Sequence, residues 1–229
     1  MYYYFDPLYL YLVLPTFLFA VFAQIRVSSV FKKYSKQYTT SGMTGAEAAM
    51  AVLNQAGING IFIQRTSGSL TDHFDPKNNT IFLSDNVHDS ATVAAIGVAA
   101  HEAGHAIQYA ENYFPIKIRT AIIPVTKIGS YLAVPIIILG FFLEMAGLVN
   151  FGILLFGSIV LFQLVTLPVE FDASKRAILA LTNSNRVHPD EIPGAKKVLS
   201  AAALTYVAAL AASIAQLLRF IVLANRRRR

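Results

Sequence analysis

Long blocks of apolar residues dominate the pattern of hydrophobic and polar positions along this chain. The first block runs from Leu8 to Ile25, and two more run from Ile128 to Phe142 and from Leu148 to Val169. Each approaches the roughly 20 residues that a helix needs to cross the ~30 Å hydrocarbon layer of a bilayer. The pattern therefore predicts an integral membrane protein with at least three transmembrane helices.

The break between the second and third blocks is short and contains one charged residue, Glu144. These two blocks are therefore predicted to form a helical hairpin in the membrane. A fourth apolar block, from Ala201 to Ala224, is rich in alanine, contains Arg219 and leads into four terminal arginines. It is expected either to span the bilayer or to lie along the interface or against the other helices.

The polar segment between the first block and the hairpin has the pattern of a small α/β unit. Thr44 and Glu47 are spaced as a capping box, which begins a helix that Gly57 ends. Residues 58–65 have the composition of a strand, and a turn signal at residues 75–79 separates two more short extended segments. A small sheet is therefore expected in this segment.

Two further helices are predicted outside the apolar blocks. One runs from Ala91 to Ala110, with Asp89 or Ser90 as N-cap, and contains only helix-tolerant residues apart from two glycines. The other is expected to open at Glu170, just after Pro168, since proline favours the first turn of a helix.

Composition and charge agree with a membrane protein and suggest its orientation. The chain is 55% hydrophobic and only 14% charged. Eight basic residues lie between residues 26 and 119 and five between residues 175 and 197, and three spans place both segments on one side of the membrane. The positive-inside rule then predicts that this side is the cytoplasm and that the N-terminus is outside. If the fourth block also spans, the four terminal arginines lie outside, against the rule.

The first block is expected to be a retained anchor rather than a signal peptide. Residues 1–6 are aromatic and acidic instead of basic, and no small-residue cleavage site follows residue 23. Tyrosines among these first residues are expected to lie at the level of the lipid headgroups.

One five-residue motif carries the chemistry: His101, Glu102, Ala103, Gly104 and His105, or HExxH. Residues four apart lie on the same face of a helix, so His101 and His105 can hold one Zn²⁺ per chain through their imidazole nitrogens. Glu102 lies beside them and can accept a proton from water that the zinc activates. The alternative is a pair of ordinary histidines on an alanine-rich helix.

A catalytic zinc site needs a third protein ligand and an open fourth position. Glu170 is the best-placed acid downstream of the motif, because it opens a predicted helix whose other face is apolar. Its alternative role is a favourable interaction with the helix N-terminus. The other downstream acids suit a ligand less well: Glu111, Glu144, Asp172, Asp190 and Glu191.

The predicted sheet offers a candidate substrate contact. His73 lies beside the predicted turn and can touch the substrate, the metal or the oxyanion that forms during hydrolysis. A lone histidine beside a turn more often has a structural role. An exposed edge of the sheet can also bind an extended peptide as an added strand.

Several other chemistries are excluded by what the sequence lacks. It has no cysteine, which excludes disulfides, thiolate zinc sites and a cysteine nucleophile. It has no glycine-rich phosphate loop and no serine nucleophile elbow. The net charge of +6 does not indicate nucleic acid, because the basic residues cluster beside the apolar blocks, where contacts with anionic headgroups are expected.

Three stretches of the chain together resemble the bacterial YugP family of neutral zinc metallopeptidases of the membrane: Val98–Gln108 around the motif, Leu70–Pro76 before it and Pro168–Ser174 after it. The resemblance covers nearly the whole chain, in the order anchor, motif helix, hairpin and Glu-bearing helix. The chain is more distantly similar to the HtpX-type membrane peptidases, which are gluzincins.

The resemblance implies that Glu170 is the third zinc ligand, because the HtpX-type peptidases carry this ligand in a Glu–aromatic–x–Ala–Asp stretch. Ser174 stands where that stretch has Asp. This departure leaves open which group orients the zinc histidines, since a hydroxyl does not orient a histidine as a carboxylate does. Asp172 is expected on a different face of the helix from Glu170.

The expected fold is a mainly α membrane protein with three to four transmembrane helices and a small α/β, zincin-like catalytic portion made of the HExxH helix, the Glu-bearing helix and the short sheet. Five domains are predicted: the membrane anchor 1–26, the catalytic segment 27–120, the hairpin 121–169, the Glu-bearing helix and loop 170–200, and the C-terminal helix with basic tail 201–229.

The expected function is that of a zinc metalloendopeptidase in the bacterial cell membrane, acting on peptides or proteins, membrane proteins included. The alternatives are a site-2-type intramembrane protease, with the HExxH helix itself in the bilayer, and a metal-binding membrane scaffold without catalysis. The physiological substrate and the oligomeric state are outside what the sequence predicts.

Overall fold

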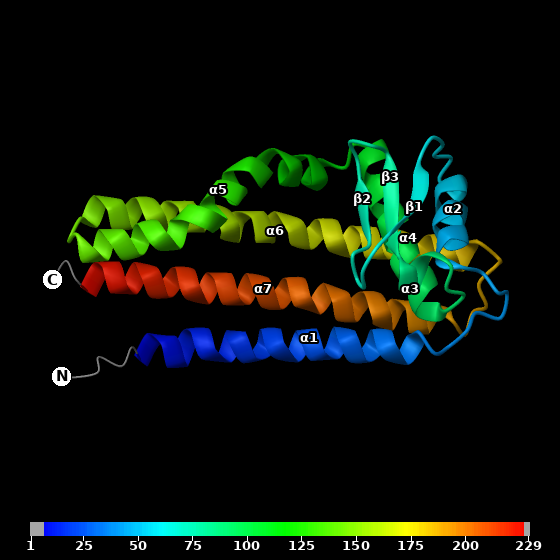
Figure 1. Ribbon diagram of the computed structural model, residues 1–229, viewed down its shortest axis with the longest axis horizontal. Coiled ribbons are helices and arrows are strands. Elements are labelled where there is room, and N and C mark those ends of the chain that lie inside the picture. The colour runs from blue at the N-terminus through cyan, green and yellow to red at the C-terminus, as the bar shows by residue number, and fades with distance from the viewer. Residues whose placement is uncertain (1–6, 227–229) are drawn as a thin grey trace. The chain divides into compact units, whose positions relative to one another are not determined.

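The computed structural model describes residues 7–226, and it is mainly helical with one small sheet (Figure 1). The predictions for residues 1–6 and for the last three arginines lie outside the described residues. The elements in chain order are η1 (Tyr9–Val13), α1 (Leu14–Tyr34), α2 (Gly45–Gln55), β1 (Phe62–Thr66), β2 (His73–Asp75), β3 (Thr80–Ser84), α3 (Asp85–His88), α4 (Val93–Ala110), α5 (Phe114–Phe142), α6 (Ala146–Asn183) and α7 (Ile192–Arg226).

Four helical segments are long and apolar enough to cross a membrane, which confirms the predicted class of mainly α membrane protein. They are Tyr9–Tyr34, Phe114–Phe142, Ala146–Asn183 and Ile192–Arg226. Most side chains in their apolar parts are not buried inside the protein, as expected of surfaces that face lipid. The fourth apolar block belongs to α7, so it is a candidate span as well.

The chain divides into two compact units, each built from separate parts of the sequence. The first, here called the helical unit, contains residues up to 24, residues 117–167 and residues from 205. The second, here called the mixed unit, contains residues 25–116 and 168–204, and therefore the sheet, α2, α3, α4 and the HExxH motif. The five domain boundaries predicted from the sequence stay a prediction.

Close helix packing through small residues holds the helical unit together. A β-carbon on Gly152 of α6 would lie 2.6 Å from the Ile137 side chain and 3.0 Å from the Ala133 carbonyl oxygen of α5. Phe156 of α6 packs edge-on against Phe220 of α7, with ring centroids 5.3 Å apart. Small residues at such contacts are typical of helices that pack within a membrane.

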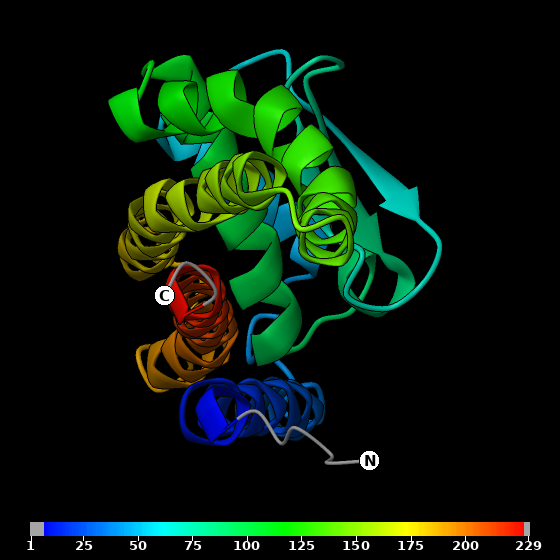
Figure 2. The ribbon, with the colours of Figure 1, turned by 90° about the vertical axis from the view of Figure 1, so that its left-hand side faces the viewer.

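The mixed unit places α4 between a sheet and two other helices. The strand order is β1-β3-β2, with β1 parallel and β2 antiparallel to β3. Figure 2 shows α4 between this sheet and the C-terminal part of α6. On that second side Gly97 of α4 approaches Ala195 of α7, and Gly104 of α4 approaches Ala173 of α6.

The capping box at Thr44 is present, whereas the predicted start of the first strand is displaced. The Thr44 oxygen accepts a bond from the Glu47 amide, and the Glu47 carboxylate accepts one from the Thr44 amide. Strand β1 begins four residues later than expected, because the Ile58 amide bonds to the Leu53 carbonyl and completes the end of α2. Gly57 ends that helix as expected, with φ +69°.

The N-cap predicted for the motif helix at Asp89 or Ser90 is wrong. Thr92 is the N-cap of α4, and its side chain accepts a hydrogen bond from the Ala95 amide. The residues before it are held extended, because Ala91 and Val93 pair through their backbones with residues 37–39. Long-range pairing therefore overrides the local signal.

The helix expected to open at Glu170 does not begin there. Helix α6 runs without a break from Ala146 to Asn183 and contains Pro168. A proline inside a helix removes one backbone hydrogen bond, and membrane helices tolerate this loss. Glu170 is therefore far from any helix N-terminus, which removes the alternative role that the sequence offered for it.

Gly104 yields a first testable prediction. A β-carbon there would lie 2.6 Å from the Ala173 carbonyl oxygen, so Gly104→Ala is expected to force α4 and α6 apart and destabilise the protein by about 1–3 kcal/mol. Gly157→Ala in α6 is the control, because nothing lies within 4 Å of its added carbon. Thermal unfolding in detergent measures both, and equal melting temperatures would contradict the prediction.

Candidate metal centre

The HExxH motif lies in the middle of α4, and the helix places its two histidines on one face. The rings of His101 and His105 meet edge-on, with centroids 4.7 Å apart. Glu170 reaches them from α6: its Oε2 lies 3.2 Å from His101 Nε2 and 3.5 Å from His105 Nε2. Residues 69 positions apart in the sequence thus form one cluster, and within the described residues no other group of three could hold a metal ion.

These three residues fit zinc in both chemistry and spacing. Two imidazole nitrogens and one carboxylate oxygen are ligands of catalytic zinc sites. Ligand bonds of about 2.0–2.1 Å in a tetrahedron place neighbouring ligand atoms roughly 3.3 Å apart, close to the 3.2 and 3.5 Å seen here. Glu170 is 2% exposed, whereas His101 is only half-buried, so the cluster is reachable from outside on the His101 side.

Glu102 is buried beside the cluster, with 8% of its surface exposed. Among residues 7–226, no hydrogen bond or ion pair engages its carboxylate, although its charge acts on His105. Its carboxylate oxygens are not among the fully buried atoms that lack a partner, so they remain accessible. Its carboxylate therefore lies beside the three candidate ligands, close enough for its charge to act on His105.

Each histidine is held through its other ring nitrogen by a different partner. Ser174 Oγ lies 3.1 Å from His101 Nδ1. Gln108 Oε1 lies 3.0 Å from His105 Nδ1. Such partners orient the ring of a metal-binding histidine and select its tautomer. The hydroxyl of Ser174 therefore contacts His101, one of the candidate metal ligands.

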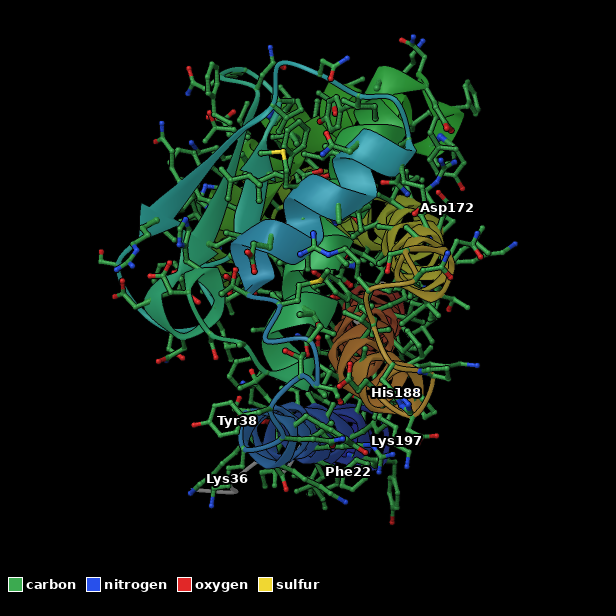
Figure 3. All side chains as sticks on the ribbon, turned by 90° about the vertical axis from the view of Figure 1, so that its right-hand side faces the viewer. Phe22, Lys36, Tyr38, Asp172, His188 and Lys197 are labelled. Carbon is green, nitrogen blue, oxygen red and sulfur yellow. The ribbon has the colours of Figure 1, made fainter. Side chains whose placement is uncertain are left out.

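Gln108 connects the cluster to a group of charged residues on α4 and α6. Its Nε2 donates to the Val169 carbonyl at 2.8 Å and to Asp172 Oδ2 at 2.9 Å. Asp172, which lies on α6 (Figure 3), also accepts a bond from Arg176 Nε at 2.5 Å. Arg176 in turn pairs with Glu111 at 2.6 Å. Asp172 does lie on another face from Glu170, as expected, and it contacts Gln108 rather than a histidine.

His73 lies on the exposed edge strand β2, outside the metal-binding group. Its Nδ1 lies 2.8 Å from the Thr71 carbonyl oxygen, and its ring stacks on Phe82 at 4.9 Å. These contacts fix the ring against the sheet. A contact between His73 and substrate stays a prediction.

Sequence reasoning missed Gln108. The available signal was its spacing, because it lies three residues after His105 on the same helix and such residues are neighbours. A buried glutamine on an alanine-rich helix face needs hydrogen-bond partners. Its partners on α6 come from residues more than 60 positions away, so the pattern along the chain could not name them.

The electrostatics of the cluster favour a charged His105 before a metal binds. Burial of the ring lowers the pKa of His105, but its hydrogen bond with Glu170 and the charges of Glu102 and Glu170 outweigh burial. The pKa of His105 therefore lies above its ordinary value of 6.5.

This raised pKa predicts a pH dependence of metal binding. Zinc needs the neutral imidazole, so a proton on His105 competes with the metal as the pH falls. We expect zinc affinity to decrease by about tenfold per pH unit for each proton displaced, once the pH falls below this raised pKa. Chelator competition at a series of pH values measures this, with His88→Gln as a control that keeps the same profile. An affinity that stays constant down to about pH 5.5 would contradict the prediction.

Comparison with known proteins agrees with this cluster. The family model described as "Putative neutral zinc metallopeptidase" matches residues 9–225. The "Putative membrane protease YugP" of Bacillus subtilis (strain 168) is 41% identical over 216 residues, which cover 94% of this chain and 96% of that protein. No solved structure matches the chain. Since the match extends over nearly the whole length, the chain belongs to this neutral zinc metallopeptidase family.

Proposed function

We propose that this protein is a zinc-dependent endopeptidase of the membrane, with one Zn²⁺ held by His101, His105 and Glu170. The observation that carries the proposal is that Glu170 Oε2 lies 3.2 and 3.5 Å from the Nε2 atoms of His101 and His105, distances that fit neighbouring ligands of a tetrahedral site. The carboxylate of Glu102 beside them, which none of the described residues pairs with, supports the same function. The zinc metallopeptidase family and the relative named a membrane protease are consistent with it.

When bound, zinc would lower the pKa of water and polarise the scissile carbonyl. Glu102 would accept a proton at its carboxylate as water attacks the carbonyl carbon, and would return that proton to the leaving amine nitrogen. Ser174 and Gln108 would keep the histidine rings in place during these steps. Because Glu102 has no other partner, its carboxylate is available for this transfer.

We propose peptides and proteins, membrane proteins included, as substrates. Strand β2 pairs only with β3 among the described strands, which leaves its other edge available for an extended peptide.

His73 is exposed on this strand, which supports a contact with substrate. His73→Ala is then expected to raise KM for peptide cleavage more than it lowers kcat, because the residue is outside the metal cluster.

The test is to purify the protein in detergent, measure its zinc content and follow casein cleavage. One zinc per chain is expected, with cleavage lost on chelation and restored by added zinc. Absence of zinc in the purified protein, and no binding on addition, would overturn the proposal. Zinc without cleavage of casein or of unfolded membrane proteins would instead support a metal-binding scaffold.

The structure disfavours an intramembrane protease of the site-2 type. Such an enzyme would place the HExxH helix within the bilayer. Among the described helices, the four candidate spans do not include α4. Buried residues of α4 pack against α2, the sheet and α7 instead of presenting a lipid-facing surface.

We further propose that the metal centre faces the cytoplasm of a bacterial cell, on the basis of the basic residues that flank the apolar segments. Because the sequence has no cysteine, single cysteines can report the topology. Met145→Cys, in the turn between α5 and α6, is expected to react with a membrane-impermeant thiol reagent in intact cells. Ser69→Cys, in the loop before β2, is expected to react only after lysis. The reverse pattern would invert the orientation.

A further inference from the structure

Gln108 is completely buried, and the contacts of its side chain determine how its amide is oriented. One terminal atom faces two oxygen acceptors, the Val169 carbonyl and Asp172 Oδ2. That atom must be the amide nitrogen, because only the nitrogen carries hydrogens to donate. The other terminal atom, which faces His105 Nδ1 at 3.0 Å, is therefore the amide oxygen.

This orientation dictates the tautomer of His105. An amide oxygen can only accept a hydrogen bond, so the proton of the neutral ring must be on Nδ1. The lone pair of Nε2 then points to the site where Glu170 and His101 converge. The amide of Gln108 thus presents the ligand atom of His105 in the form that binds a metal.

Asp172 holds the amide in this orientation. Its Oδ2 accepts bonds from both Gln108 and Arg176, and Arg176 is shared with Glu111 at the C-terminal end of α4. If the amide flipped, an oxygen would face two oxygen acceptors without a hydrogen between them. The anchored carboxylate therefore makes the flipped amide unfavourable.

The same contacts also join the two helices that supply the ligands. Gln108 bonds on α6 to Val169, one residue before Glu170, and to Asp172, two residues after it. Holding both positions against α4 fixes the rotation of α6 at Glu170. One buried side chain thus orients His105 directly and places Glu170 through the backbone of its own helix.

We propose that Gln108, Asp172 and Arg176 are positioning residues of the metal centre, which set the tautomer of His105 and the placement of Glu170. This inference rests on the proposed zinc function. We call Gln108, Asp172, Arg176 and Glu111 together the Gln108 relay. In many zinc sites a carboxylate in direct contact with the histidine orients its ring. We infer that the Gln108 relay has this role for His105.

The test measures metal binding separately from activity. Gln108→Met keeps the length of the side chain without its hydrogen bonds, and Asp172→Asn changes the anchoring charge at almost constant shape. Asp190→Asn is the matched control, because its side chain is 91% exposed. Zinc affinity comes from chelator competition, the ligand geometry from the visible spectrum of the cobalt(II)-substituted protein, and folding from thermal melts.

We expect zinc affinity to drop about 10–100-fold in Gln108→Met and Asp172→Asn, with a changed cobalt(II) spectrum in protein that is still folded. Glu111→Gln, at the exposed end of the relay, should show a smaller drop, and Asp190→Asn none. If Gln108→Met does not fold, the near-isosteric Asp172→Asn still decides the question.

Two results would overturn the inference, and they are distinguishable. Wild-type zinc affinity and an unchanged cobalt(II) spectrum in both folded variants, even with lower melting temperatures, would make the relay merely structural and leave the zinc function intact. A wild-type protein that binds no zinc would overturn the proposed function itself and the inference with it.

Discussion

Replacing Glu102 by glutamine is expected to abolish peptide cleavage while the protein keeps its zinc. The substitution preserves the shape of the side chain and removes its ability to take up a proton, so the rate should fall by about 10²–10⁴-fold. Glu102 is not among the three ligand residues, and zinc content should stay at the wild-type value. Measuring kcat/KM together with bound zinc separates these two effects.

Glu47→Gln is the matched control for this experiment. It makes the same chemical change in the capping box of α2, which is exposed and outside the metal cluster. Cleavage by this control should equal that of the wild type. Full activity of Glu102→Gln would require another proton acceptor and would remove Glu102 from the proposed mechanism.

Replacing Glu170 by glutamine is expected to have the largest effect on metal binding. A neutral amide oxygen is a poor replacement for a carboxylate ligand, and the two histidines would lose the negative charge that lies 3.2 and 3.5 Å from them. Zinc affinity should fall by more than about 100-fold, beyond the effect of changing a group that only orients a ligand. Chelator competition on folded, detergent-purified protein measures the change.

The result for Glu170→Gln also tests the composition of the ligand set. Asp172→Asn provides a comparison on the same helix, since its smaller expected loss distinguishes a ligand from a residue that supports one. Unchanged zinc affinity in Glu170→Gln would show that the third ligand is elsewhere in the chain. Loss of zinc together with loss of folding would call for Glu170→Asp, which keeps the charge and shortens its reach.

Taken together, the Glu102 and Glu170 variants separate chemistry from metal binding. A catalytic base is needed only during turnover, so its loss leaves the bound metal unaffected. A ligand is needed before turnover begins, so its loss lowers both metal content and activity. A scaffold without catalysis would lose metal in the Glu170 variant, keep it in the Glu102 variant, and show no cleavage in either variant or in the wild type.

The sequence alone predicted those features that depend on residues close together along the chain. The spacing of His101 and His105 places both on one helix face whatever surrounds them. The capping box of Thr44 and Glu47 is complete within four residues. The long apolar segments required only length and composition to indicate membrane helices. Each of these predictions agrees with the structure for the same reason, which is that the interactions concerned are local.

The third ligand was at the limit of this local reasoning. Glu170 could be selected among the downstream acids, but its proximity to a helix start offered a competing role. Only the structure shows that α6 passes through Pro168 without ending. Membrane helices tolerate the hydrogen bond that a proline removes, and a pattern of residue types does not show whether a helix continues through a proline or begins at it.

The partners of the histidines were decided by tertiary structure alone. Ser174 reaches His101 across 73 sequence positions, and Gln108 reaches Asp172 across 64. Which of two nearby acids on α6 faces the two histidines and which faces Gln108 depends on the rotation of that helix against α4. The close contact at Gly104 and Ala173 sets how near the two helices lie. The sequence thus determined which residues can bind a metal, and only the packing of α4 against α6 determined how they are held.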